Sequence, residues 1–159
     1  MDPFSITVGT VTLFEICRRF GAYLKDIQAG AAHINDEIAS LSREVEALRS
    51  VNDMVQTAYK GFQFNTEASE PPTIEQASLW SNVRSFLQEC CLNVEKLESL
   101  VIVIVGKRPK DESSRLARKL GGFRQQLKKQ SKEEDFEKLY DRLNRSQNSL
   151  QLMLQLIAM

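Results

Sequence analysis

Apolar residues recur every three to four positions along most of the chain, which is the pattern of amphipathic α-helices. The first helix is expected to begin after Asp2 as N-cap, with Pro3 at its first position, and to run to about Gln28 before Gly30. One side of this helix carries seven apolar residues at core spacing: Ile6, Leu13, Ile16, Cys17, Phe20, Leu24 and Ile27. This side is predicted to pack in the core of a bundle.

The first three turns of that helix are apolar on a second side as well. No residue between Asp2 and Glu15 carries a charge. The second side consists of Phe4, Val8 and Val11, with Phe14 on the flank. A soluble helix needs only one apolar face, so the second requires a cover of its own. Two interpretations stay open and are compatible in a domain that switches: these residues lie buried between other helices at rest, or this end is releasable and seeks lipid.

A second helix is predicted over 34–59, with a near-heptad apolar stripe that only Asn52 interrupts. The stripe consists of Ile34, Ile38, Leu41, Val45, Leu48, Val55 and Tyr59. A glycine and a Pro-Pro pair then predict a loop over 61–73, which Phe62 and Phe64 are expected to pack against the bundle.

Thr73 and Gln76 have the spacing of a capping box, which predicts that a third helix begins there. Its stripe consists of Leu79, Val83, Phe86, Cys90, Val94, Leu97, Val101 and Ile104. The β-branched run 100–105 is also compatible with a strand. We favour a helix because the stripe continues through the run, up to Gly106 and Pro109.

A shorter basic helix is expected over 112–129, weakened by the glycine pair at 121–122. A last helix over 133–157 begins with an acidic cluster that suits a helix N-terminus. Its stripe consists of Phe136, Leu139, Leu143, Leu150, Leu154 and Ile157. Four long helices and one shorter basic helix predict an all-α helical bundle. We expect residues 1–159 to form one domain, the N-terminal part of a longer protein.

Charge narrows the possible partners. The formal net charge is zero, but residues 107–129 contain nine basic and two acidic side chains. Anionic lipid would attract this segment, whereas a solvated helix face is the simpler interpretation. Nucleic acid is not expected as a partner, because only Phe123 interleaves with the basic residues.

Three cysteines, two of them adjacent, indicate a reducing compartment, with Cys17 as a small buried apolar residue.

No catalytic constellation is found in the sequence. The single histidine, His33, is expected to be a surface or capping residue, and the residues needed for a phosphate loop or a metal site are missing. Glutamates such as those of 95–98 are interpreted as solvated charge. We therefore expect no enzyme, no cofactor and no metal.

The apolar segment 3–14 would be about 18 Å long as a helix, whereas the hydrocarbon core of a bilayer is roughly 30 Å thick. The segment could therefore enter a bilayer but not cross it alone.

Three short motifs resemble the HeLo-like domain, the N-terminal domain of fungal STAND proteins, which are NLR-like NTPase receptors. The motifs are Asp2-Pro3-x-Ser5-Ile6, Glu44-Val45-x-x-Leu48 and Ser149-Leu150-x-Leu152-x-Leu154, the last preceded by Leu143. The family is related to the HeLo domain of heterokaryon incompatibility proteins, and resembles the four-helix domain of the necroptosis pseudokinase and the plant coiled-coil domain.

The resemblance implies an executioner of regulated cell death in fungal innate immunity. Such a domain is cytoplasmic, forms a homo-oligomer when a downstream NTPase or amyloid-signalling domain assembles, and moves to the plasma membrane. There its N-terminal helix inserts and the membrane is permeabilised. The alternative is a non-toxic helical self-association or adaptor module for receptor assembly.

Two groups of residues would perform this function. The expected membrane-insertion set is Phe4, Ile6, Val8, Val11, Leu13, Phe14 and Glu15, with Glu15 turned toward a water-filled lumen in a ring of helices. The expected set for anionic phospholipid is Lys107, Arg108, Lys110, Arg115, Arg118, Lys119, Arg124, Lys128 and Lys129.

Overall fold

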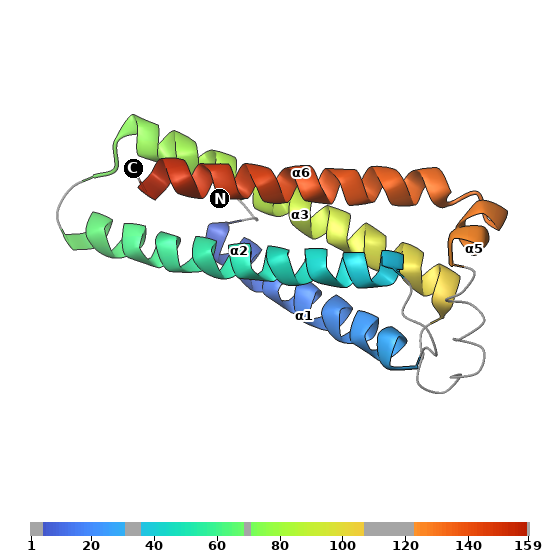
Figure 1. Ribbon diagram of the computed structural model, residues 1–159. Coiled ribbons are helices and arrows are strands. Elements are labelled where there is room, and N and C mark those ends of the chain that lie inside the picture. Colours follow the sequence, from blue (N-terminus) through green and yellow to red (C-terminus); the bar gives the residue numbers. More distant parts are fainter. Residues whose placement is uncertain (1–4, 31–35, 69–70, 107–122, 159) are drawn as a thin grey trace.

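A computed structural model of the protein describes residues 5–30, 36–68, 71–106 and 123–158, and all regular structure in these ranges is helical. The elements are α1 (Ile6–Gly30), α2 (Asp36–Ala68), α3 (Ile74–Val105), α5 (Phe123–Lys129) and α6 (Glu133–Ala158) (Figure 1). The predicted all-α class is confirmed. Of the helix expected over 112–129, the part before Phe123 lies outside the described residues.

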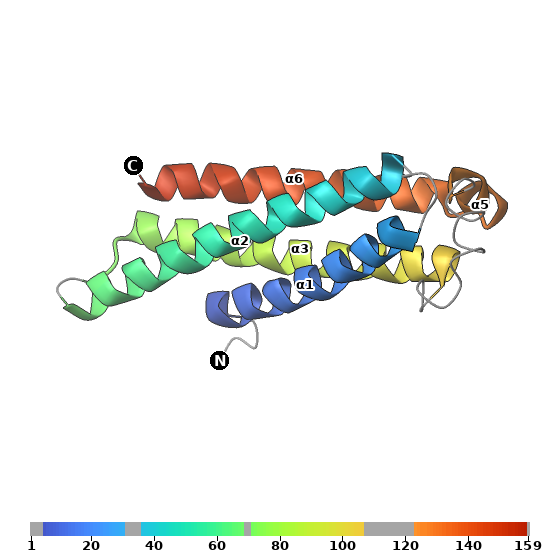
Figure 2. The same ribbon diagram turned by 60° about the horizontal axis from the view of Figure 1, so that its bottom comes forward.

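The long helices pack side by side around a shared core. α1 packs against α2 and α3, and α6 packs against the same two helices from the opposite side (Figures 1 and 2). The short α5 lies at the end of the bundle where α3 ends and α6 begins. At the other end α3 begins and α2 and α6 end, and α1 begins further in along the bundle.

α1 begins later than the sequence predicts. Ser5 is not helical, and its Oγ accepts a hydrogen bond from the Val8 amide at 3.1 Å. Ser5 is therefore the N-cap, and the expected start after Asp2 is wrong. A serine hydroxyl aimed at the third amide of the first turn is a strong cap, and it lies just before the first core residue, Ile6.

α2 continues eight residues into the expected loop over 61–73, so that prediction is wrong for 61–68. Gly61 is tolerated because the helix around it is held by rings. Phe62 and Tyr59 pack against Trp80 of α3, with ring centroids 5.4 and 5.0 Å from it. This packing offsets the cost of about 1 kcal/mol for a helical glycine. Phe64, by contrast, is 72 % exposed, so its expected packing is wrong.

The predicted capping box at the start of α3 is confirmed. The Gln76 amide donates to Thr73 Oγ1 at 3.1 Å, and the Thr73 amide donates to Gln76 Oε1 at 3.0 Å. The helix continues through 100–105 without a break, which confirms the helical interpretation of that run. It ends at Gly106, whose φ of +108° suits glycine.

The predicted stripes form the core. Every residue of the α1 stripe is buried, as are Ile38, Leu41, Val45, Leu48 and Val55 of α2. In α3 the buried members are Val83, Cys90, Val94, Leu97, Val101 and Ile104, and in α6 they are Phe136, Leu143 and Leu150. Tyr59, Phe86, Leu139, Leu154 and Ile157 are partly buried against the same core. Ile34 lies outside the described residues.

Candidate functional site

The first three turns of α1 expose apolar side chains to solvent. Val8 is 48 % exposed and Val11 is 51 % exposed, whereas Ile6 and Leu13 are buried in the core. The interpretation that the outward side is buried between other helices is therefore wrong for Val8 and Val11. Phe4 lies outside the described residues.

Phe14 and Glu15 form the edge of this surface. The Arg49 guanidinium of α2 lies over the ring of Phe14, 5.2 Å from its centroid, and Phe14 is half-buried. Glu15 is exposed and pairs with Arg18 at 3.0 Å on the same helix. An exposed pair of this kind contributes about 0.5 kcal/mol at most, so it does not fix the position of the helix.

One buried polar contact holds the first turns against α2. The Asn52 side-chain nitrogen donates to the Thr10 carbonyl oxygen at 2.9 Å, and both residues are buried. The Asn52 side-chain oxygen is also buried and has no hydrogen-bond partner in the described part of the chain. An unsatisfied buried acceptor costs about 1–3 kcal/mol, which is comparable to what the hydrogen bond contributes. Asn52 thus orients the start of α1 without adding much stability.

The second half of α1 is fastened more firmly to α3. Arg19 donates two hydrogen bonds to the Glu98 carboxylate, at 2.9 and 2.7 Å. The hydrogen bond to Glu98 raises the pKa of Arg19 above its ordinary value. The Tyr23 hydroxyl also donates to the Gly106 carbonyl. Glu98 is buried, so interpreting it as solvated charge is wrong. These polar contacts between α1 and α3 therefore lie beyond the uncharged first turns of α1.

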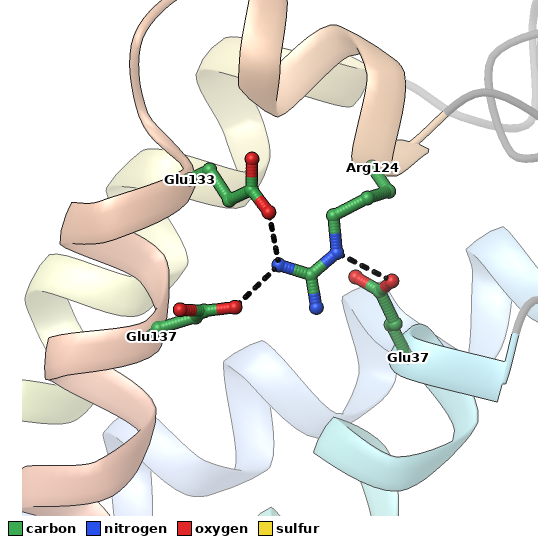
Figure 3. Close-up of polar contacts among 4 residues, drawn as sticks. All are labelled: Glu37, Arg124, Glu133 and Glu137. Carbon is green, nitrogen blue, oxygen red and sulfur yellow. Dashed lines mark hydrogen bonds and ion pairs between the residues drawn. The ribbon is translucent and has the colours of Figure 1, made fainter.

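Among the described basic residues of 107–129, one is paired with carboxylates and two are exposed without an ion pair. Arg124 of α5 contacts Glu37 of α2 at 2.9 Å, and Glu133 and Glu137 of α6 at 3.3 and 2.9 Å (Figure 3). Its guanidinium is paired with three carboxylates, so its expected role as a lipid ligand does not fit this conformation. The exposed Lys128 and Lys129 make no ion pair within the described ranges. The other expected members, which fall within 107–119, lie outside the described residues.

We expect Arg124→Met to lower the free energy of unfolding by about 1–2 kcal/mol. The substitution leaves three carboxylates near one another, and hydrogen bonds to charged groups contribute about 1.5–3 kcal/mol before allowance for partial exposure. Urea denaturation of the full chain measures this change. Lys128→Met is the matched control, because it removes a basic side chain of the same helix that is exposed. An equal loss for both variants would show that the three contacts stabilise nothing.

The two expected lipid-binding surfaces lie far apart. Ser40 and Tyr140 are hydrogen-bonded at 2.8 Å, which sets the register of α2 against α6. Asn52, twelve residues further along α2, contacts Thr10 of α1. At 1.5 Å per residue, these twelve residues span about 18 Å, and the part of α6 from its start at Glu133 to Tyr140 adds about 10 Å. The first turns of α1 therefore lie roughly 30 Å along the bundle from Lys129, which precedes α6 by a short turn. The two surfaces cannot meet a flat membrane together while the bundle stands upright on it.

Further exposed apolar side chains lie on α2, α3 and α6. They are Met54 and Phe64 in the second half of α2, Ile74 at the start of α3, and Leu152 and Leu156 near the end of α6. No charged residue occurs in α6 after Arg145. From the sequence, only α1 was expected to present such a surface. The signal that could have revealed the rest was the uncharged run of α6, whose outward positions hold leucine.

The three cysteines are buried, free thiols. Burial raises the pKa of Cys17 and of Cys91 to about 12, and it raises the pKa of Cys90 as well. These thiols are therefore protonated near neutral pH and are poor nucleophiles. The predicted role of Cys17 as a small core residue is confirmed.

In the described residues no cluster of His, Cys, Asp or Glu could hold a metal ion. None of the described helices is long and apolar enough to cross a bilayer. Comparison of the chain with protein-family models, with curated proteins and with solved structures found no match.

Proposed function

We propose that this chain is a HeLo-like domain, a bundle of four long helices and one shorter basic helix that executes regulated cell death by permeabilising the plasma membrane. It would be cytoplasmic at rest, would oligomerise when a downstream receptor domain assembles, and would have no enzymatic activity. The observation that carries the proposal is the exposure of Val8 and Val11 on an uncharged helix end whose opposite side is buried.

Release of only the first turns of α1 is energetically accessible. These turns bury two large apolar side chains, Ile6 and Leu13, besides the contact between Asn52 and Thr10. At about 1.5–3 kcal/mol per side chain, freeing them costs several kcal/mol. Burying Ile6 and Leu13 in lipid instead returns a similar amount, and lipid would also cover Val8 and Val11, which are half exposed at rest. A modest bias from oligomerisation is then sufficient to shift the balance.

Glu15 limits how the released segment can insert. Its carboxylate is exposed beside Val8 and Val11, and a single helix would carry it into hydrocarbon at a cost of about 2.5–3.5 kcal/mol. Several copies arranged in a ring would turn Glu15 toward a water-filled lumen and avoid that cost. The proposal therefore requires a homo-oligomer at the membrane.

Lys128 and Lys129 supply exposed positive charge for anionic lipid at the other end of the bundle. Because they lie roughly 30 Å from the first turns of α1, a domain held by both surfaces would lie on its side on the membrane. Alternatively, α1 would leave the bundle before it inserts. Either route separates the first contact with lipid from the insertion step.

A non-toxic self-association or adaptor module is the second candidate. It is supported by the exposed apolar residues on α2, α3 and α6, which exceed what insertion of α1 alone requires. In this case the outward side of α1 would dock against a second copy, and lipid would play no part.

Induced oligomerisation of the full chain in yeast separates the two candidates. The chain is fused at its C-terminus to a chemically inducible dimerisation domain, and uptake of a membrane-impermeant dye is followed after the inducer is added. We expect dye uptake and growth arrest within the induced population only. Clustering without dye uptake would refute the executioner function and favour the adaptor. The fusion partner alone is the control for toxicity of the inducer.

A further inference from the structure

An open groove of about 710 Å³ runs along the outer side of α3 and α6. Leu92, Lys96 and Val103 of α3 and Lys132, Leu139 and Arg142 of α6 are among its lining residues. A second hollow shares Leu92, Lys96 and Arg142 and continues the groove along α6. This groove contains none of the residues that were expected from the sequence to bind lipid.

The floor of the groove is apolar. Leu92 and Val103 are 51 % and 60 % exposed, and their spacing of eleven residues places them on the same side of α3. Leu139 of α6 is half-buried between the two helices, and Leu100 closes the floor. Exposed apolar side chains inside a groove with a charged rim are typical of a binding surface rather than of scattered surface hydrophobics.

The rim is predominantly cationic. Four basic residues and two carboxylates line the first hollow, which gives a net charge of +2. Lys96, Lys132 and Arg142 make no ion pair in the part of the chain that the structure describes, whereas Lys138 pairs with Glu134. The two carboxylates, Glu95 and Asp135, also make no ion pair among the described residues. Three cations and two carboxylates are therefore left unpaired at the groove, and the excess charge is positive.

We propose that the groove between α3 and α6 binds an anionic phospholipid, with the phosphate at Lys96, Lys132 and Arg142 and an acyl chain along the apolar floor. The argument is charge complementarity, because the lining has a net charge of +2 beside exposed apolar side chains, and an anionic amphiphile complements both. The groove also adjoins the exposed turn of Lys128 and Lys129, which lies just before Lys132 in the chain. This inference rests on the proposed membrane function and adds a specific lipid site to it.

A soluble short-chain phosphatidylserine tests the groove in the absence of a membrane. We expect its titration into the full chain to shift the amide NMR signals of 92–103 and 132–142 in a saturable manner. Glycerophosphoserine, which has the same headgroup and no acyl chains, is expected to bind at least tenfold more weakly, because the floor then stays uncovered. Shifts elsewhere, or equal affinity for both compounds, would overturn the proposal.

Vesicles test the charge of the rim. The double variant Lys96→Glu with Arg142→Glu should bind phosphatidylcholine vesicles that contain phosphatidylserine about thirtyfold more weakly. This value follows from a loss of about 1 kcal/mol for each of the two cations. The matched control is the double variant Arg43→Glu and Lys60→Glu, which makes the same charge change at exposed positions of α2. An equal loss in both double variants would show that only net charge matters and would overturn the groove.

The apolar floor has its own matched pair. Leu92→Ser with Val103→Ser should weaken binding of the short-chain phosphatidylserine severalfold, whereas Leu152→Ser with Leu156→Ser, at exposed positions that do not line the groove, should not. If the wild-type chain binds these vesicles but the groove variants bind equally well, the groove is refuted and the executioner function stands. If the short-chain lipid binds the groove but vesicles neither bind nor leak, the executioner function fails and the lipid site remains. Dimerisation that the groove variants abolish, without any lipid effect, would identify a protein partner instead.

Discussion

Replacing both Val8 and Val11 by aspartate should abolish vesicle leakage and cell killing while leaving the fold intact. Each aspartate raises the cost of placing the helix in hydrocarbon by about 3 kcal/mol relative to valine, so the pair lowers insertion by about four orders of magnitude. In the resting bundle both side chains are about half exposed, and exposed substitutions usually change stability by no more than about 0.5 kcal/mol. The aspartate at position 8, in the first turn of α1, also suits the positive end of the helix dipole.

The measurement is dye release from anionic vesicles, accompanied by a thermal melt of the same preparations. Met54→Asp is the matched control, because Met54 is 58 % exposed on α2, two residues after Asn52, which contacts Thr10 of α1. We expect the control to leak as the wild type does. Leakage by the Val8 and Val11 double variant would refute insertion of α1, whatever the melt shows. Loss of leakage in the control as well would extend the active surface to exposed apolar residues of α2.

The apolar periodicity of the sequence was sufficient to predict the core of the bundle. Apolar residues at helical spacing share one side of a helix, and that side is the one that is buried. Ile6 and Leu13 continue the stripe of α1, and both are buried. The cap of α3 was predictable for a similar reason, since Thr73 and Gln76 interact with each other within one turn. Local patterns are reliable where the forces that act on them are local.

The errors occurred where tertiary contacts decide the outcome. Glycine ends many helices, but α2 continues past Gly61 because the ring of Phe62 packs against Trp80 of α3. For Glu98 the sequence predicts solvated charge, because its partner, Arg19, lies 79 residues away in the chain. Asn52 interrupted an apolar stripe, and only the structure reveals that it contacts the Thr10 carbonyl. Pairings between helices leave no signal in the spacing of a single sequence.

The candidate site was predictable only in part for the same reason. The uncharged start of α1 identified the segment, but its exposure depends on α2 and α3 covering one side and leaving Val8 and Val11 uncovered. In the basic segment, composition alone did not distinguish Arg124, which three carboxylates occupy, from the open Lys128. A count of charges indicates attraction to anionic lipid, whereas the pairing of those charges decides which of them are available.

The clamp between Arg19 and Glu98 should be strongly asymmetric when its two partners are removed one at a time. The side chain of Glu98 is 11 % exposed and that of Arg19 is 57 % exposed. Arg19→Ala leaves a buried carboxylate without its partner, which we expect to lower the free energy of unfolding by about 2–3 kcal/mol, after a discount for the solvent that reaches the arginine. Glu98→Gln leaves Arg19 largely in water, so its expected cost is about 1 kcal/mol.

Urea denaturation of both single variants and of the double variant gives a complete cycle. In the double variant the side chain at position 98 is a neutral amide, so loss of the arginine should cost far less there than in the wild-type background. If the clamp holds α1 in its resting position, Arg19→Ala should also release dye from anionic vesicles at protein concentrations where the wild type does not. Equal destabilisation by the two single variants would contradict the burial argument. Destabilisation without dye release would show that the clamp supports the fold alone, because release of α1 would then be limited by the apolar contacts of Ile6 and Leu13.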